Sequence, residues 1–252
     1  MGYTGNPTFG LLHRGKYVGE PIVGTKSGVF SSGSLTLDSM IGGGLKKGSL
    51  NLIEVSNDVS FDVTSLFLRT ALSNFINNGH RVLFVPFIGS AESQLEEILP
   101  NISKETVRES IVSLPYLNKQ RKNIKDQGLT GDATKDFDSI DSKIEELSED
   151  SDKPVLVVFS QDAVEGIYGV ENVSKHLANS IALSKNLAAI QLQLCSPGSV
   201  LLPELKALCD SNLRIEMLHG TPLAYSIKPL SVLHGMMTDE STPGRLSLVP
   251  IV

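Results

Sequence analysis

The stretch that decides the fold is residues 31–67, SSGSLTLDSMIGGGLKKGSLNLIEVSNDVSFDVTSLF. Within it, the apolar run Leu50–Val55 is followed by a polar turn at 56–58 and then by apolar side chains at helical spacing over residues 64–78. A buried strand, a loop and a helix in this order are the arrangement of a phosphate-binding loop, in which N–H groups at the helix start face an anion. The stretch therefore predicts a nucleotide-binding architecture.

The loop itself lacks the Gly-Lys-Ser/Thr sequence that a working phosphate loop carries. There the lysine neutralises phosphate oxygens and the hydroxyl binds Mg²⁺, whereas this chain has Ser60-Phe61-Asp62. We expect Asp62 to cap the helix, and Phe61 to fill the phosphate space or to pack under the loop. We predict no cofactor, no metal and no catalytic residue, and we take as the remnant of the loop Ser56, Asn57, Asp58, Ser60, Phe61 and Asp62.

Length and composition set limits on the class of protein. A chain of 252 residues with 40% hydrophobic content fits one α/β core domain, 31–252, preceded by an arm, 1–30. The net charge of −6 and the isoelectric point of about 5.4 do not favour nucleic acid as a partner. Cys195 and Cys209 have no metal-site spacing, so we expect buried free thiols. No membrane-spanning run or leader is visible, which predicts a cytoplasmic protein.

Strands alternate with helices along most of the chain, which predicts a mostly parallel twisted sheet with helices on both faces. A hairpin signal and a last strand near the end add C-terminal antiparallel strands. A polar segment, 118–134, is expected to be a flexible surface loop. The expected strands are 50–55, 81–86, 110–114, 154–160, 188–194, 213–218, 223–228 and 246–251, and the expected helices are 35–41, 64–78, 91–99, 137–147, 173–187 and 203–209.

The pattern G-x-x-S-S-G-S-x-x-L-D-x-x-I-G-G-G-L-x-x-G-S over residues 28–49 closely resembles the start of the core in RecA/RadA/KaiC-like ATPases. The segment IEVSNDVSFD resembles the phosphate loop of the archaeal KaiC-like branch, near the archaellum accessory ATPase. The resemblance extends to the order of elements over residues 28–250. It implies a RecA-like core and a homo- or hetero-oligomer with RecA-like subunits.

The departures from this family's pattern decide the functional interpretation. Laid on that pattern, the phosphate lysine falls near Phe61 and the Mg²⁺-binding hydroxyl near Asp62. The glutamate that positions water in the family is replaced by the run Pro86-Phe87-Ile88, and Ser160 stands where an aspartate would reach Mg²⁺. Asp162 comes two positions late. Of the family's basic residues that act on a neighbouring subunit, Lys228 matches one, while Leu230 fills the place of a second.

Several other residues have more ordinary explanations than a functional one. Lys46 and Lys47 precede the first strand, so we expect solvated turn lysines rather than substitutes for the missing lysine. The helical spacing of the acidic residues at 92, 96 and 97 fits a solvated helix face. The basic cluster 119–125 fits a solvated loop. Surface, turn or edge positions are expected for His80, His219 and His234.

The leading hypothesis is a non-catalytic RecA-like pseudo-ATPase that acts as an oligomeric scaffold or regulatory subunit, and not as an enzyme. Loss of the lysine, the hydroxyl, the glutamate and the aspartate removes most of the charge stabilisation that phosphoryl transfer needs. Two alternatives stay open. One is an ATP-binding sensor without efficient hydrolysis, and the other is a nucleic-acid-binding ring subunit similar to the inert RecA-like subunits of Elongator.

Overall fold

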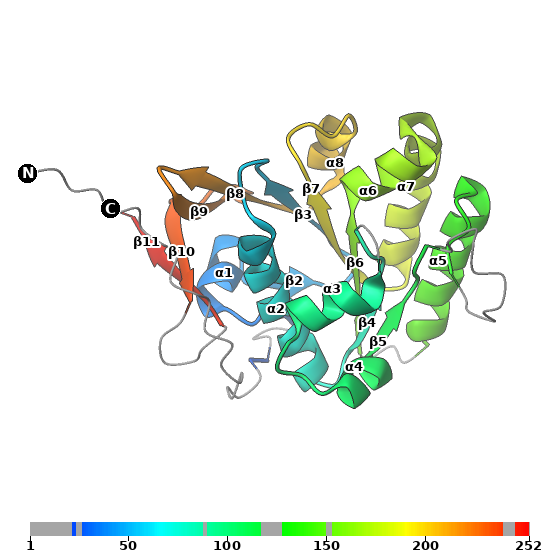
Figure 1. The fold of residues 1–252 in the computed structure, drawn as a ribbon, viewed down its shortest axis with the longest axis horizontal. Helices are drawn as coiled ribbons and strands as arrows, with labels where there is room; N and C mark the ends of the chain where they lie inside the picture. The colour runs from blue at the N-terminus through cyan, green and yellow to red at the C-terminus, as the bar shows by residue number, and fades with distance from the viewer. Residues whose placement is uncertain are drawn as a thin grey trace, which may run out of the picture.

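The protein is described by a computed structural model over residues 22–23, 27–87, 90–116, 128–149, 153–238 and 245–251. In this part of the chain, nine strands form one sheet with the order β11-β10-β9-β8-β3-β7-β6-β4-β5 (Figure 1). The strands are β1 (Val29–Phe30), β2 (Leu45–Lys46), β3 (Leu50–Val55), β4 (Arg81–Phe84), β5 (Ile111–Ser113), β6 (Val155–Ser160), β7 (Ile190–Cys195), β8 (Ser211–Leu218), β9 (Thr221–Lys228), β10 (His234–Thr238) and β11 (Leu246–Pro250). The helices are α1 (Leu35–Met40), α2 (Phe61–Asn77), α3 (Ala91–Ile98), α4 (Lys104–Ser110), α5 (Ala133–Leu147), α6 (Gln161–Tyr168), α7 (Val170–Asn186) and α8 (Leu202–Leu208).

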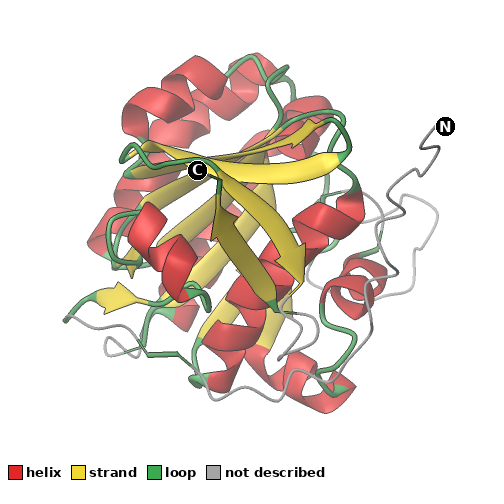
Figure 2. Cartoon of the chain, turned by 90° about the vertical axis from the view of Figure 1, so that its left-hand side faces the viewer, coloured by secondary structure: helices red, strands yellow, loops and turns green. Residues whose placement is uncertain are grey.

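The sheet is parallel from β8 to β5 and antiparallel from β8 to β11. Helices α1, α2 and α3 pack on one face, whereas α5, α7 and α8 pack on the other. Figure 2 shows the strands between these two helical layers and the twist of the sheet. The predicted mostly parallel sheet with helices on both faces and C-terminal antiparallel strands is therefore confirmed.

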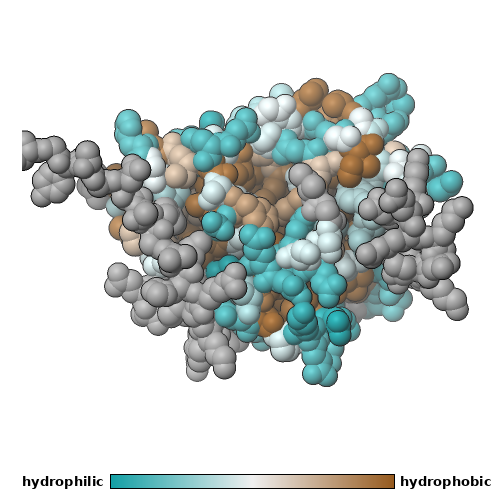
Figure 3. Space-filling model, in the orientation of Figure 1, coloured by the Kyte–Doolittle hydropathy of each residue, from teal (hydrophilic) through white to brown (hydrophobic). Residues whose placement is uncertain are grey.

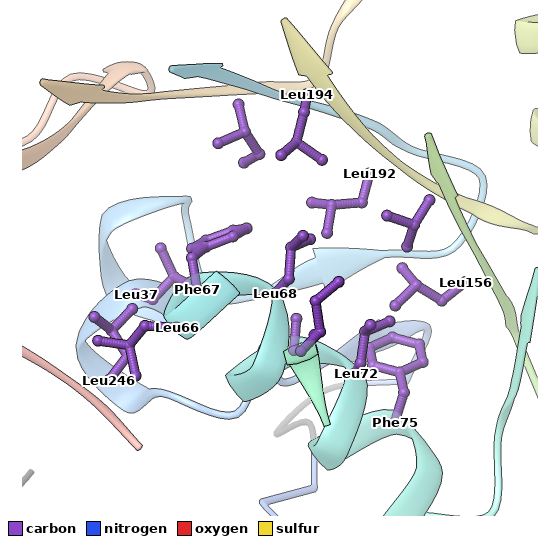
Figure 4. Packing of buried hydrophobic residues seen from close by; sticks show 14 of the residues in the cluster. Leu37, Leu66, Phe67, Leu68, Leu72, Phe75, Leu156, Leu192, Leu194 and Leu246 are labelled. Carbon is purple, nitrogen blue, oxygen red and sulfur yellow. The ribbon is translucent and has the colours of Figure 1, made fainter. Parts of the chain in front are cut away.

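Helix α2 is the centre of the larger core cluster. Its apolar side chains meet α1, the central strands and β11, so residues distant in sequence converge on one helix (Figure 4). Leu68 and Leu72 are fully buried, and Leu37, Leu192 and Leu246 belong to the same cluster. Burial of this apolar surface is the main stabilising term of the fold, at roughly 25 cal/mol per Å² of apolar area removed from water.

The serine and aspartate residues of the 28–49 pattern hold the chain before α1 in place. The Asp38 carboxylate accepts hydrogen bonds from the Ser31 hydroxyl, from the Ser32 N–H at 2.7 Å and from the Ser32 hydroxyl at 2.6 Å. Asp38 is only 7% exposed. Ser34 caps α1 by accepting from the Leu37 N–H. The part of the sequence that carries the family resemblance therefore has a packing role in this chain.

Several elements differ from the sequence-based expectations. Helix α2 begins three residues before the expected start, at Phe61, because the loop is shorter than the apolar pattern alone indicates. Five short elements were not predicted, namely α4, α6, β1, β2 and β10. Helix α4 has no buried residue and therefore no apolar stripe. Without an apolar stripe, the helical period of this segment cannot be recognised in the sequence.

Part of the expected 118–134 loop lies outside the described residues, at 118–127. The described part is held by Asp136, a buried side chain of α5. Its carboxylate accepts from the Thr130 N–H and Gly131 N–H, both at 2.7 Å, and from the Tyr168 hydroxyl at 2.9 Å. Leu129, also buried, joins the cluster under α5. Leu129 therefore anchors this segment in the core, whereas residues 130–132 stay exposed and are tied to α5 by the Asp136 hydrogen bonds. Of the expected arm, residues 1–21 and 24–26 lie outside the described part.

Both cysteines are free and buried, as predicted. Burial raises the pKa of the Cys195 thiol to about 12 and also raises that of Cys209, so neither forms a reactive thiolate near neutral pH. Searched over the described residues, no helix combines the length and apolarity needed to cross a membrane.

His80 gives the fold a testable dependence on pH. Its ring lies 5.3 Å from the Phe30 ring and 5.4 Å from the Phe75 ring, measured between centroids. Burial lowers the pKa of His80, and the charges of Lys153 and Lys47 lower it further. Because the unfolded chain binds the proton more readily than the folded one, this contribution to stability is complete above pH 6.5 and declines as the pH falls below it.

We expect His80→Phe to weaken this pH dependence, because phenylalanine keeps the aromatic contacts and cannot bind a proton. The measurement is the free energy of unfolding in urea at a series of pH values below and above 6.5. The wild-type protein should lose more stability on acidification than the variant. Parallel curves for the two proteins would show that His80 is not the group responsible.

Candidate functional site: the loop between β3 and α2

The remnant loop is a tight turn of five residues between Val55 and Phe61. The Ser56 N–H donates to the Ile215 carbonyl at 2.9 Å, which continues the pairing of β3 with β8. The Val59 N–H donates to the Ser56 carbonyl at 3.0 Å and closes the turn. The structure thus brings all six predicted loop residues together at the carboxyl end of β3, with Asn57 and Asp58 exposed at the tip.

The start of α2 corrects one prediction. Ser60, not Asp62, occupies the N-cap position, with φ of −69° and ψ of 157°. Asp62 lies in the first turn, where its negative charge still interacts favourably with the helix dipole. The Ser60 side chain makes no capping hydrogen bond. The backbone N–H groups of the first turn have no partner within the helix, as at any helix start.

Phe61, which the sequence pattern aligns with the phosphate lysine, lies at the surface. Its side chain is 37% exposed. Val59 of the same loop packs against the main core cluster and Phe61 does not, so the expected packing of Phe61 under the loop is not observed. Figure 3 shows apolar surface in the region where Figure 1 places the ends of β3 and β7 and the start of α2.

The positions that correspond to the other two catalytic residues have structural partners. Phe87 follows β4, where its ring packs 5.5 Å from that of Phe84 and its N–H donates to the Gln94 side chain at 3.1 Å. Ser160 ends β6 and caps α6 by accepting from the Ala163 N–H at 3.4 Å. Neither position offers a free carboxylate.

The Asp162 carboxylate is directed at a neighbouring loop. It accepts from the Ser196 N–H at 2.7 Å and from the Ser196 hydroxyl at 2.6 Å. Asp162 lies in the first turn of α6, which excludes it from the end of β6. Its role in the described structure is therefore to fasten the segment that follows β7.

Glu165, which sequence reasoning missed, fastens the same segment one helical turn later. Its carboxylate accepts from the Ser199 hydroxyl, from the Val200 N–H at 3.1 Å and from the Leu201 N–H at 3.3 Å. The Gln161 amide also donates to it at 2.9 Å. The available signal was the i, i+3 spacing of Asp162 and Glu165, which places both carboxylates on one side of a helix.

A negative charge occupies the start of every helix that follows β3, β4, β6 and β7. The first turns of α2, α3, α6 and α8 contain Asp62, Glu92, Asp162 and Glu204 respectively. The sequence has no lysine or arginine in the connecting segments 56–60, 85–90 and 196–201. These four helix starts lie at one edge of the sheet, which we call the carboxyl edge. Its fixed charges repel a polyphosphate.

Glu54 is a second charged residue that sequence reasoning missed. It lies on β3 just before the loop and is 1% exposed. Its carboxylate accepts from the Asn212 amide at 2.6 Å and forms an ion pair with the Lys206 ammonium at 3.0 Å. A strand position within an apolar run gives no indication of such a pair, because Lys206 comes from α8, far along the chain.

The lysines considered as substitutes lie elsewhere. Lys46 ends β2, and Lys47 places its ammonium 5.9 Å from the centroid of the Phe30 ring. Both precede the amino end of β3, whereas the loop follows its carboxyl end, so the prediction that they do not replace the missing lysine is supported.

Lys228 matches a basic residue that acts on a neighbouring subunit in the family, but here it donates to the Cys209 carbonyl of its own chain. Leu230 is 86% exposed.

Glu96 and His219 have the ordinary roles expected of them, whereas the expected edge or turn position of His234 is wrong, because β10 lies between β9 and β11. Glu96 forms an exposed ion pair with Lys104 at 2.5 Å. His219 lies in the turn between β8 and β9 with a positive φ of 50°, and the buried His234 places its Nδ1 2.9 Å from the Val232 carbonyl oxygen. Among the described residues, no three His, Cys, Asp or Glu side chains could jointly hold a metal ion. The basic cluster at 119–125 lies outside the described residues.

The sequence of the chain is similar to that of a known protein. The chain is 24% identical over 224 residues to protein GvpD2 of Halobacterium salinarum, a match that covers 84% of this chain and 44% of that protein. The chain thus spans less than half the length of this relative. No protein-family model matches the present chain.

A solved structure gives the clearer result for the fold. The KaiC-like protein PH0186 of Pyrococcus horikoshii OT3 superposes with a TM-score of 0.66 at 11% identity, over 88% of this chain and 99% of that one. The mostly parallel sheet with helices on both faces and C-terminal antiparallel strands is consistent with a RecA-like fold. The chain therefore has the fold of the RecA/KaiC-like ATPases.

Proposed function

We propose that this chain is a non-catalytic RecA-like subunit that acts through association with other protein subunits. The observation that carries the proposal is the charge of the carboxyl edge. An ATPase of this fold needs a lysine, a hydroxyl, and two carboxylates that are free to act on water and Mg²⁺. This chain has an aromatic ring and acidic first turns at this edge. Its nearby carboxylates are hydrogen-bonded to a neighbouring loop. Phosphoryl transfer depends almost entirely on such charge stabilisation.

Apolar residues at the same edge support association as the retained activity. Phe61 is 37% exposed at the start of α2, and Val200 is 65% exposed in the segment after β7. The Val200 N–H is bonded to Glu165, which presents this side chain on a fixed backbone. Contiguous apolar surface that stays exposed is typical of protein interaction sites, and the proposal takes Phe61 and Val200 as part of such a surface.

One observation favours a second candidate, an anion sensor. The Ser60 side chain leaves the N–H groups at the start of α2 uncapped, and such groups can bind a phosphate through the backbone alone. A sensor of this kind would bind nucleotide without hydrolysis. The adjacent Asp58 and Asp62 carboxylates oppose it, so we rank it second.

Sedimentation velocity with and without Mg·ATP tests the proposed association. We expect a concentration-dependent oligomer whose size does not change with nucleotide, and about a tenfold weaker association in Val200→Ser. The matched control is Leu35→Ser, because Leu35 is also 65% exposed but lies at the start of α1. A protein that stays monomeric, or that assembles only with ATP, would contradict the proposal.

A further inference from the structure

A cavity of about 290 Å³ lies between α3, α4 and β5, away from the loop between β3 and α2. Its floor is apolar and includes Leu95, Leu99 and Ile111, which are 6%, 3% and 6% exposed. Figure 1 shows these three elements together at the β5 end of the sheet. The volume is close to the lower limit of pockets that bind small molecules, about 300 Å³.

Charges of both signs stand around this floor. Glu92 and Glu96 come from α3, and Lys104 and Arg108 come from α4. Glu96 and Lys104 pair with each other at 2.5 Å and so neutralise one another. Within the described part of the chain, Glu92 and Arg108 form no ion pair. The cavity therefore offers one anion and one cation beside an apolar surface.

Two contacts at the cavity disfavour a helix or an added strand as its occupant. The Glu96–Lys104 pair joins α3 to α4, so a chain segment laid between the helices would have to break it. At the edge strand β5, the Ile111 N–H already donates to the Val107 carbonyl, which removes a donor that strand addition would use. A small molecule can enter without either change.

We propose that this cavity binds a free α-amino acid with a large apolar side chain. Its ammonium group would pair with Glu92 and its carboxylate with Arg108, while its side chain lies on the floor at Leu95 and Ile111. Charge-assisted hydrogen bonds of this kind fix orientation, and the apolar floor supplies most of the affinity. The inference is independent of the proposed association and of the absence of nucleotide binding.

Methyl NMR titrations of the full chain with L-phenylalanine, 3-phenylpropionate and phenethylamine test this proposal. Phenylalanine should shift the methyl signals of Leu95, Val107 and Ile111. Each analogue lacks one charge and should bind about tenfold more weakly or worse. In Glu92→Gln, phenylalanine and 3-phenylpropionate should bind equally. In Arg108→Gln, phenylalanine and phenethylamine should bind equally.

Glu97→Gln is the matched control, because Glu97 is an exposed carboxylate of α3 that does not line the cavity. It should keep the full preference for phenylalanine. The proposal is wrong if no cavity methyl shifts, or if Glu92→Gln still prefers phenylalanine over 3-phenylpropionate. It is also wrong if a peptide with an internal phenylalanine binds more tightly than the free amino acid, since the occupant would then be a protein segment.

Discussion

Gly33→Ala should lower the free energy of unfolding by about 3 kcal/mol or more, from the combined cost of left-handed backbone and overpacking. Gly33 has a φ of +89°, and an added Cβ would lie 2.5 Å from the Thr70 carbonyl oxygen and 2.9 Å from the Cβ of Asn74. Both neighbours belong to α2, the helix on which the core is built, so they cannot move aside without disturbing it. The glycine is needed for the close approach of the two segments.

Gly28→Ala provides the matched control. Gly28 also has a positive φ, +75°, but a Cβ there would meet no atom within 4 Å. Its substitution should therefore cost only the conformational strain, about 1 kcal/mol. Urea unfolding of the two variants separates strain from contact. Equal losses would show that the approach to Thr70 is not what requires glycine at position 33.

Lys206→Met should lower the free energy of unfolding by about 2 kcal/mol, because it leaves the buried Glu54 carboxylate with only the Asn212 amide. Loss of one partner of a fully buried pair costs about 3–5 kcal/mol. The smaller value applies here because Lys206 is 39% exposed, so water screens the pair.

A double-mutant cycle with Glu54→Gln tests the origin of this loss. In the Glu54→Gln background, Lys206→Met should cost less than about 0.5 kcal/mol, since no buried charge is left unpaired. Lys175→Met is the comparison at the surface, where its pair with Glu171 at 2.8 Å is 62% and 86% exposed and should contribute little. If the cost of Lys206→Met is unchanged by Glu54→Gln, packing of the lysine stem and not charge explains it.

The elements that were predicted well are those with a strong apolar pattern. The bounds of β3 were predicted without error, because Leu50–Val55 carries apolar residues on both faces and ends in a polar turn. Helix α2 was found, but its start was misplaced, because its first two residues, Phe61 and Asp62, are exposed and add nothing to the apolar period.

The interactions that fix the candidate site could not be predicted in the same way. Glu54 meets Lys206, and Glu165 meets the Val200 N–H, across large separations in sequence. Single-sequence patterns describe spacing along one element, whereas these pairs depend on how elements are packed. The position of the loop could be predicted from the sequence, and with it the proposal that Phe61 and Asp62 stand where the phosphate-binding lysine and hydroxyl would be.

Isothermal titration of the wild-type chain with Mg·ATP tests the central claim most directly, with Phe61→Lys/Asp62→Ser as the comparison. We expect no binding tighter than about 1 mM for the wild type, and a measurable gain in the double variant, which restores the cation and the hydroxyl. Binding of Mg·ATP by the wild type in the micromolar range, with turnover, would contradict the account.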